Sequence, residues 1–156
     1  MKERYEVKVA VFLIITRIYN GKKQILLQKR KNTGYMDGKY DMACSGHLEK
    51  GETLTHALVR EAKEELGISI NETDLKLVHT LHPYEEGYLN FFFSTVEYKG
   101  IPKIMEEEKC EDLNWFDIDD LPENIIPKIK NVIKNIESDI NYDDGDFSYQ
   151  KLNMKK

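Results

Sequence analysis

The 156-residue sequence contains only two cysteines, Cys44 and Cys110. Two cysteines are too few for a disulfide framework, so we expect reduced thiols in a cytoplasmic protein. A basic excess is also missing, because 23 lysines and arginines stand against 28 acidic residues and the net charge is −5. This balance gives no general attraction to nucleic acid or to an anionic membrane, and neither is an expected partner.

Long hydrophobic runs are absent as well. The apolar run Val9–Ile15 is too short to span a bilayer, and no small-residue cleavage site of a signal peptide follows it. We therefore interpret it as part of a buried strand. The length favours a single domain, residues 1–140, and the tail at 141–156 has no clear period and is expected to be loosely ordered or to make contacts that its pattern does not predict.

Strands make up most of the predicted elements. Two of them, 5–18 and 24–30, are apolar and β-branched, and Asn20-Gly21 between them favours a hairpin. Further strands are predicted at 42–45, 75–81, 88–98 and 113–118, with loops at 31–41, 82–87 and 99–109.

Two helices are predicted, one at 54–66 and one that begins at Pro127. In the second helix the apolar residues recur at helical spacing: Ile129, Val132, Ile133, Ile136 and Ile140. Two helices on opposite faces of a mixed sheet would make a three-layer α/β/α sandwich.

The helix predicted at 54–66 carries three closely spaced glutamates. Thr53 is a suitable N-cap, and Gly67 is a suitable stop. Glu61, Glu64 and Glu65 lie at i, i+3 and i+4, so they share one arc of the helix and repel one another. Taken alone, the three residues indicate an acidic surface. Their carboxylates are equally the ligands that a hard divalent cation such as Mg²⁺ prefers.

Residues within and on both sides of this helix match the signature of a known protein family. The Nudix hydrolase signature is GX5EX7REUXEEXGU, where U is a bulky aliphatic residue. The matching positions are Gly46, Glu52, Arg60, Glu61, Glu64, Glu65, Gly67 and Ile68. Only Ala62 departs from the signature, because it is smaller than the usual aliphatic residue. Over about residues 5–140 the sequence resembles the MutT-like Nudix hydrolases.

The resemblance implies a Nudix-type α/β/α sandwich and a metal-dependent hydrolysis. The substrate would be a nucleoside diphosphate linked to another group, for example a nucleoside triphosphate, oxidised or not, or a nucleotide sugar. Mg²⁺ or Mn²⁺ would be held by Glu61, Glu64, Glu65 and the backbone carbonyl of Gly46, and one of these glutamates or one from a later loop would be the general base. Dimerisation is common in the family, so a homodimer is also considered.

Three further residues have implied structural roles. Glu52 and Arg60 would pair and hold the loop against the helix, and Gly67 would end the helix. Nudix proteins often take a further carboxylate ligand or base from the loop before the last strand, where Glu106 and Glu108 lie, although an exposed acidic run is an equal interpretation of these residues.

Other candidates follow from their position in the sequence. Lys29 and Arg30 end a strand near the expected site and could hold a phosphate, although a solvated strand end is an equal interpretation. Tyr35 could form part of a substrate wall. Trp115 could stack on a base, although an aromatic residue in a strand more often belongs to the core.

Two other functions share this type of fold. A nucleotide-sensing module would bind without turnover, but such modules usually lose signature glutamates, and this sequence keeps them. An isopentenyl diphosphate isomerase would use a cysteine near Cys44, but those enzymes depart from the hydrolase signature.

Overall fold

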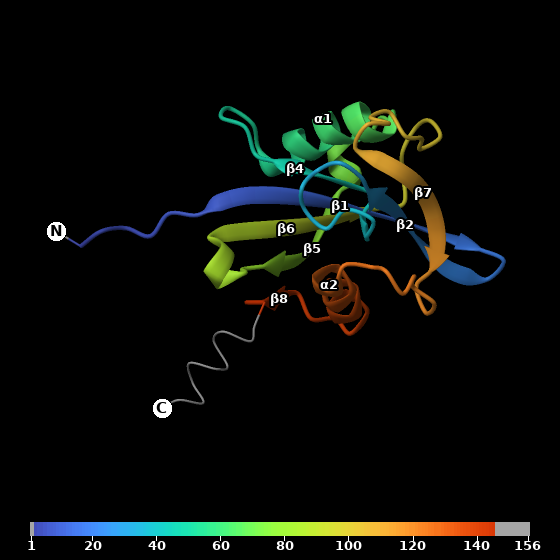
Figure 1. Ribbon diagram of the computed structural model, residues 1–156. Coiled ribbons are helices and arrows are strands. Elements are labelled where there is room, and N and C mark those ends of the chain that lie inside the picture. The colour runs from blue at the N-terminus through green and yellow to red at the C-terminus, as the bar shows by residue number, and fades with distance from the viewer. Residues whose placement is uncertain (1, 146–156) are drawn as a thin grey trace.

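The computed structural model describes residues 2–145. A mixed sheet lies between two helices, with α1 (Leu54–Leu66) on one face and α2 (Pro127–Glu137) on the other (Figure 1). This arrangement confirms the predicted α/β/α sandwich. The strands are β1 (Lys8–Tyr19), β2 (Lys22–Arg30), β3 (Tyr40–Met42), β4 (Cys44–His47), β5 (Lys76–Leu81), β6 (Tyr88–Thr95), β7 (Cys110–Asp117) and β8 (Tyr142–Asp143).

The long strand β1 organises the sheet. The strand order is β3-β2-β1-β6-β5-β8, while β4 also pairs with β1 and β7 also pairs with β2. Along one edge of β1, residues 10–13 pair with β4, and residues 16–19 pair with β2. The sheet therefore divides along this edge, and β4 lies where it divides.

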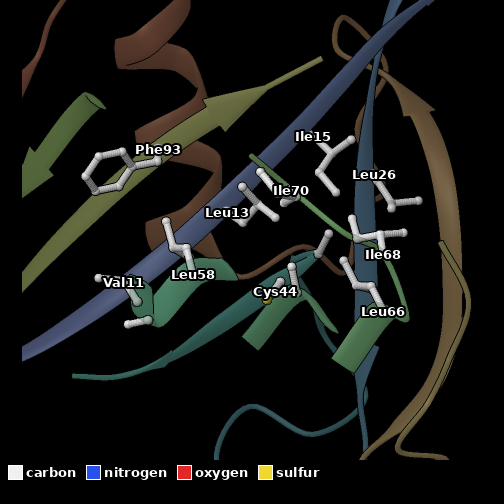
Figure 2. Packing of buried hydrophobic residues seen from close by; sticks show 13 residues of the cluster. Val11, Leu13, Ile15, Leu26, Cys44, Leu58, Leu66, Ile68, Ile70 and Phe93 are labelled. Atoms are coloured by element: carbon white, nitrogen blue, oxygen red, sulfur yellow. The ribbon is translucent and has the colours of Figure 1, made fainter. Parts of the chain in front are cut away.

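Each face of the sheet packs against one helix. Val11, Leu13 and Ile15 alternate along β1 and belong to the cluster beneath α1, whereas Ile14 belongs to the cluster beneath α2. Because successive side chains of a strand point to opposite faces, one apolar strand supplies both layers. Figure 2 shows the α1 side, where Leu58 and Leu66 lie over β1 and its neighbours.

Helix α1 begins and ends at the predicted residues. The Thr53 hydroxyl accepts a hydrogen bond from the His56 N–H at 3.2 Å, and Gly67 adopts a left-handed conformation with φ of 68°. The buried residues of the helix are Ala57, Leu58, Ala62 and Leu66. Because this apolar side lies on the sheet, the arc that carries the glutamates is turned toward β4.

Three elements differ from the sequence prediction. Strand β3 begins inside the predicted loop 31–41, where aspartate and glycine weaken the strand signal. Helix α2 ends at Glu137, because Asp139 takes a positive φ of 58°, and so Ile140 lies beyond it. Within the predicted tail, β8 pairs in parallel with β5, and residues 146–156 lie outside the described part.

Candidate active site

The carboxyl group of Glu61 lies directly on Gly46. Strand β4 places Gly46 opposite Val11 of β1, and α1 crosses above it. A Cβ atom built on Gly46 would stand 2.7 Å from Glu61 Cγ and closer still to its carboxyl group. Any other residue at position 46 would therefore displace Glu61, so the glycine is required for space.

Arg60 links the loop before α1 to the glutamates of the helix. Its guanidinium donates to both carboxylate oxygens of Glu52, at 2.9 and 2.8 Å. Its Nη1 also donates to Glu61 at 2.7 Å and makes a longer contact of 3.4 Å with Glu64. Hydrogen bonds from Arg60, and one from the Glu49 backbone at 2.8 Å, lower the pKa of Glu52 to about 2. The pair fixes the loop against the helix, and Arg60 reduces the repulsion among the glutamates.

Glu65 is the most deeply buried of the three helical glutamates that the signature contains. Its Oε2 accepts a hydrogen bond from the Ser45 backbone N–H at 3.3 Å, and the Cys44 thiol lies beside it. Burial, together with the negative charges of Glu61 and Glu106, raises the pKa of Glu65 to about 8. Burial also raises the pKa of Glu61. The charge of Glu65 is thus poorly compensated, whereas Arg60 partly compensates that of the neighbouring Glu61.

These residues suit a divalent cation. Within residues 2–145, no three acidic, histidine or cysteine side chains already stand together as a ready-made metal site. The donor set is nevertheless all oxygen, and the charges of Glu61 and Glu106 raise the pKa of the buried Glu65, an unfavourable interaction that a bound cation would relieve. Glu61 and Glu65 could therefore hold a metal, with the Gly46 carbonyl beside them and Glu106 across the cavity.

Two cavities meet at β4. The first, of about 430 Å³, lies on the α1 side and is lined by Glu65, Glu106, Arg30, Lys109 and Asn32 among others. The second, of about 390 Å³, lies on the α2 side. Both are lined by Arg30 and by the β4 residues Ser45, Gly46 and His47. We call them the α1 cavity and the α2 cavity; together they could hold the two ends of one elongated ligand.

Several residues selected from the sequence line these cavities. Arg30 lies between them, and its Nη1 donates to the buried Asp41 at 3.0 Å. Glu106 lines the α1 cavity and Tyr35 lines the α2 cavity. Glu64 is about half exposed and touches only the edge of the Arg60 network.

Three other candidates lie outside both cavities. Lys29 forms an ion pair with Glu111 at 3.0 Å, and Glu108 is exposed. Trp115 packs on the α1-side core, and the guanidinium carbon of Arg17 lies 4.2 Å from the centre of its ring. One face of its ring is therefore covered within the protein itself.

The sequence prediction missed the residues that build the α2 cavity. They include Phe12, Asp41, Tyr88, Asn90 and Lys128. Asn90 interrupts the otherwise apolar and aromatic run YLNFFF, and this single amide was the available signal. The others lie in separate elements that only the fold brings together.

Cys44 and Cys110 are both free thiols. Cys44 is completely buried, and burial together with the Glu65 carboxylate raises its pKa well above the usual value. A nucleophilic or acid-base cysteine needs access to its substrate, so this position does not favour the isomerase alternative.

Comparison with known proteins identifies the family. The model of the NUDIX domain matches residues 8–136, and the chain belongs to the Nudix family. An uncharacterized Nudix hydrolase of Listeria monocytogenes is 32% identical over 99 residues, which cover 63% of this chain and 58% of the relative. An NAD-capped RNA hydrolase NudC of Pectobacterium carotovorum is 31% identical over 123 residues, which cover 78% of this chain and 44% of the relative.

Solved structures agree with the family. The MutT NUDIX hydrolase of Burkholderia pseudomallei superposes with a TM-score of 0.70 at 25% identity, covering 81% of this chain and 95% of that protein. The NUDIX domain of Shewanella oneidensis NrtR, solved with ADP ribose, superposes with a TM-score of 0.66 at 13% identity, covering 87% of this chain and 89% of that protein. The chain is thus a MutT-like Nudix protein that spans less than two thirds of the length of the curated relatives above.

Proposed function

We propose that the protein hydrolyses the diphosphate linkage of a nucleoside diphosphate joined to another group, with Mg²⁺ as its cofactor and Mn²⁺ as a substitute. The observation that carries this proposal is the position of Glu61 and Glu65, which lie against Gly46 and Ser45 at the meeting point of the two cavities. The phosphates would occupy the α1 cavity, and the rest of the substrate would extend into the α2 cavity.

Each residue of the site has a role in this reaction. The bound cation would neutralise phosphate oxygens and lower the pKa of the attacking water. Glu61, Glu65 and the Gly46 carbonyl would hold it, with Glu64 at the exposed edge, and one of the glutamates, Glu106 included, would accept the proton of the water. Arg30 and Lys109, which line the α1 cavity, would bind the phosphates that the cation does not contact.

A substrate panel tests this function. The protein would be incubated with Mg²⁺ and nucleoside triphosphates, nucleotide sugars and dinucleotides, and the released phosphate or pyrophosphate would be measured. We expect cleavage that stops when EDTA is added and that falls at least a hundredfold in Glu65→Gln. No cleavage across the panel, with Glu64→Gln indistinguishable from the wild type, would contradict the proposal. Thermal stabilisation by a nucleotide without any product would instead support a sensing module.

A second measurement tests the metal independently of catalysis. Without metal, Glu65→Gln should melt at a higher temperature than the wild type at pH 8, because it removes a buried carboxylate that its neighbours repel. Addition of Mg²⁺ should raise the melting temperature of the wild type but not that of Glu65→Gln. The exposed Glu107→Gln should respond to Mg²⁺ as the wild type does, and an equal response of all three proteins would argue against a metal at Glu65.

The proposed partners are small molecules. None of the helices within residues 2–145 combines the length and the apolar character needed to cross a membrane. A homodimer stays a prediction, which light scattering at several protein concentrations would check.

A further inference from the structure

The side chain of Asn90 is buried without a hydrogen-bond partner. Only 4% of the residue is exposed, and within residues 2–145 its amide makes no side-chain hydrogen bond. Buried amides in folded proteins are nearly always satisfied, so an exception calls for an explanation. Among the described residues, His82 Nε2 is the only side-chain nitrogen or oxygen atom that is fully buried and has no hydrogen-bond partner. The amide atoms of Asn90 are therefore not fully enclosed by protein, and they border on an open space.

That space is the α2 cavity, which Asn90 lines. Along β6, Asn90 has the same parity as Phe92, which belongs to the core beneath α2, and the side chain therefore points to the α2 face. Its neighbour across the parallel pairing with β1 is Ala10, whose methyl group is too small to cover the amide. The fold thus leaves one hydrogen-bonding group free at the bottom of the cavity.

The walls around Asn90 suit a flat and uncharged group. Phe12, Tyr88 and Tyr35 supply aromatic rings, and Ile126 and Ile129 supply aliphatic surface. Aromatic and aliphatic walls with a few placed polar groups are typical of pockets for small organic ligands.

The charges that line the α2 cavity are already paired. Arg30 donates to Asp41 at 3.0 Å, and Lys128 donates to Glu86 at 3.1 Å. Each charged side chain on this side therefore already has a partner of opposite sign within the protein. The α2 cavity therefore favours a neutral ligand, in contrast to the acidic metal-binding side of the α1 cavity.

We propose that Asn90 hydrogen-bonds the edge of a nucleobase held in the α2 cavity and thereby sets the base preference of the enzyme. This inference rests on the proposed function for the position of the phosphates. A carboxamide presents one donor and one acceptor side by side, and it matches base edges that carry an acceptor beside a donor, as it does when it binds adenine. A base that enters gives the amide the partners that it lacks in the free protein.

Two substitutions of Asn90 distinguish recognition of a base from a purely structural role. Asn90→Leu keeps the approximate volume and removes both hydrogen-bonding atoms. Asn90→Asp replaces the donor with a second acceptor, which complements the adjacent N1–H and N2–H donors of guanine. The exposed Asn141, at the opposite end of the sheet from β4, supplies the matched control Asn141→Leu.

The assay measures kcat and KM with Mg²⁺ for ATP, GTP, CTP, UTP and methyl triphosphate, which has no base. Asn90→Leu should lower kcat/KM for the preferred nucleotide about 10–100-fold, mainly through KM, and at least tenfold more than for methyl triphosphate. Asn90→Asp should shift the ratio of kcat/KM for GTP over ATP about tenfold toward GTP. The melting temperature of Asn90→Leu should be no lower than that of the wild type, since no hydrogen bond is lost.

Equal losses on all five substrates, or no change on any of them, would overturn the role of Asn90 and leave the hydrolase proposal intact. If the wild type cleaves none of the five, calorimetry with AMP and GMP decides the matter separately. Binding to the wild type that Asn90→Leu abolishes would support the base site in a protein that is no hydrolase of these compounds. Absence of binding to the wild type, or undiminished binding to Asn90→Leu, would refute it.

Discussion

The side chain of Glu61 packs directly on Gly46. The helical glutamate rests its carboxyl group on the glycine of β4, at the position where a Cβ atom would be. All nine glycines of the sequence lie in the described part, and Gly46 is the only one of them without a positive φ. Backbone conformation therefore explains the other eight, whereas Gly46 is needed because of its neighbour.

Gly46→Ala should damage activity far more than stability. The added methyl group would push Glu61 away from its position, and a displacement of about 1 Å at a catalytic site can cost roughly a hundredfold in kcat. Gly21→Ala, at the open tip of the β1–β2 hairpin with φ of 75°, should do the reverse and lower the melting temperature while kcat stays constant. A Gly46→Ala enzyme with wild-type kcat would contradict the steric role.

Glu52→Gln should lower stability in a pH-dependent way. The folded-state pKa of Glu52, about 2, lies below its usual value of 4.5, chiefly because Arg60 donates to it. A depressed carboxylate pKa stabilises the fold fully above pH 4.5, and this contribution is lost as the pH falls from 4.5 toward 2. The difference in melting temperature between wild type and variant should therefore be constant above about pH 5.5 and shrink below pH 4.5.

The exposed Glu97, which has no ion pair within residues 2–145, supplies the control for this series. Glu97→Gln should follow the wild type throughout the titration. A difference between wild type and Glu52→Gln that grows on acidification would show that the Arg60 pair has been misassigned.

Glu106 and Glu108 should respond differently to the same substitution. Glu106 lines the α1 cavity and raises the pKa of Glu65 through its charge, whereas Glu108 is exposed and lines neither cavity. Glu106→Gln should raise the Mg²⁺ concentration for half-maximal activity about tenfold, as loss of a supporting carboxylate does at other metal sites. Glu108→Gln should leave it unchanged, and an equal or larger effect at Glu108 would reverse this assignment.

Local patterns predicted the parts of the molecule that depend on local chemistry. The spacing of apolar residues identified both helices. The residue types at Thr53 and Gly67 identified the cap and the stop of α1, and Asn20-Gly21 identified the hairpin. The sandwich followed because two amphipathic helices must cover an apolar sheet on both faces. The glutamates share an arc because helix geometry alone determines their relative directions.

Non-local contacts decided what the sequence left open. Glu106 and Glu108 have similar local surroundings, and only the path of the loop turns one of them into the α1 cavity. From the sequence alone, Trp115 could stack on a base of the substrate. In the fold, however, the β1–β2 hairpin brings Arg17 over its ring. The α2 cavity unites β1, β6 and α2, which are far apart along the chain, so no spacing rule could assemble it.

Asp143 should anchor the C-terminal strand to the sheet. Its Oδ2 lies 2.6 Å from Nε2 of His79, whose side chain is completely buried, and it also accepts from Asn135 at 3.2 Å. Asp143→Ala would leave a buried ring nitrogen without a partner, which costs about 1–3 kcal/mol. Urea unfolding should show that decrease in the free energy of unfolding, whereas Asp119→Ala, at an exposed position, should show almost none. Equal stability of Asp143→Ala and the wild type would mean that β8 is not needed to satisfy His79.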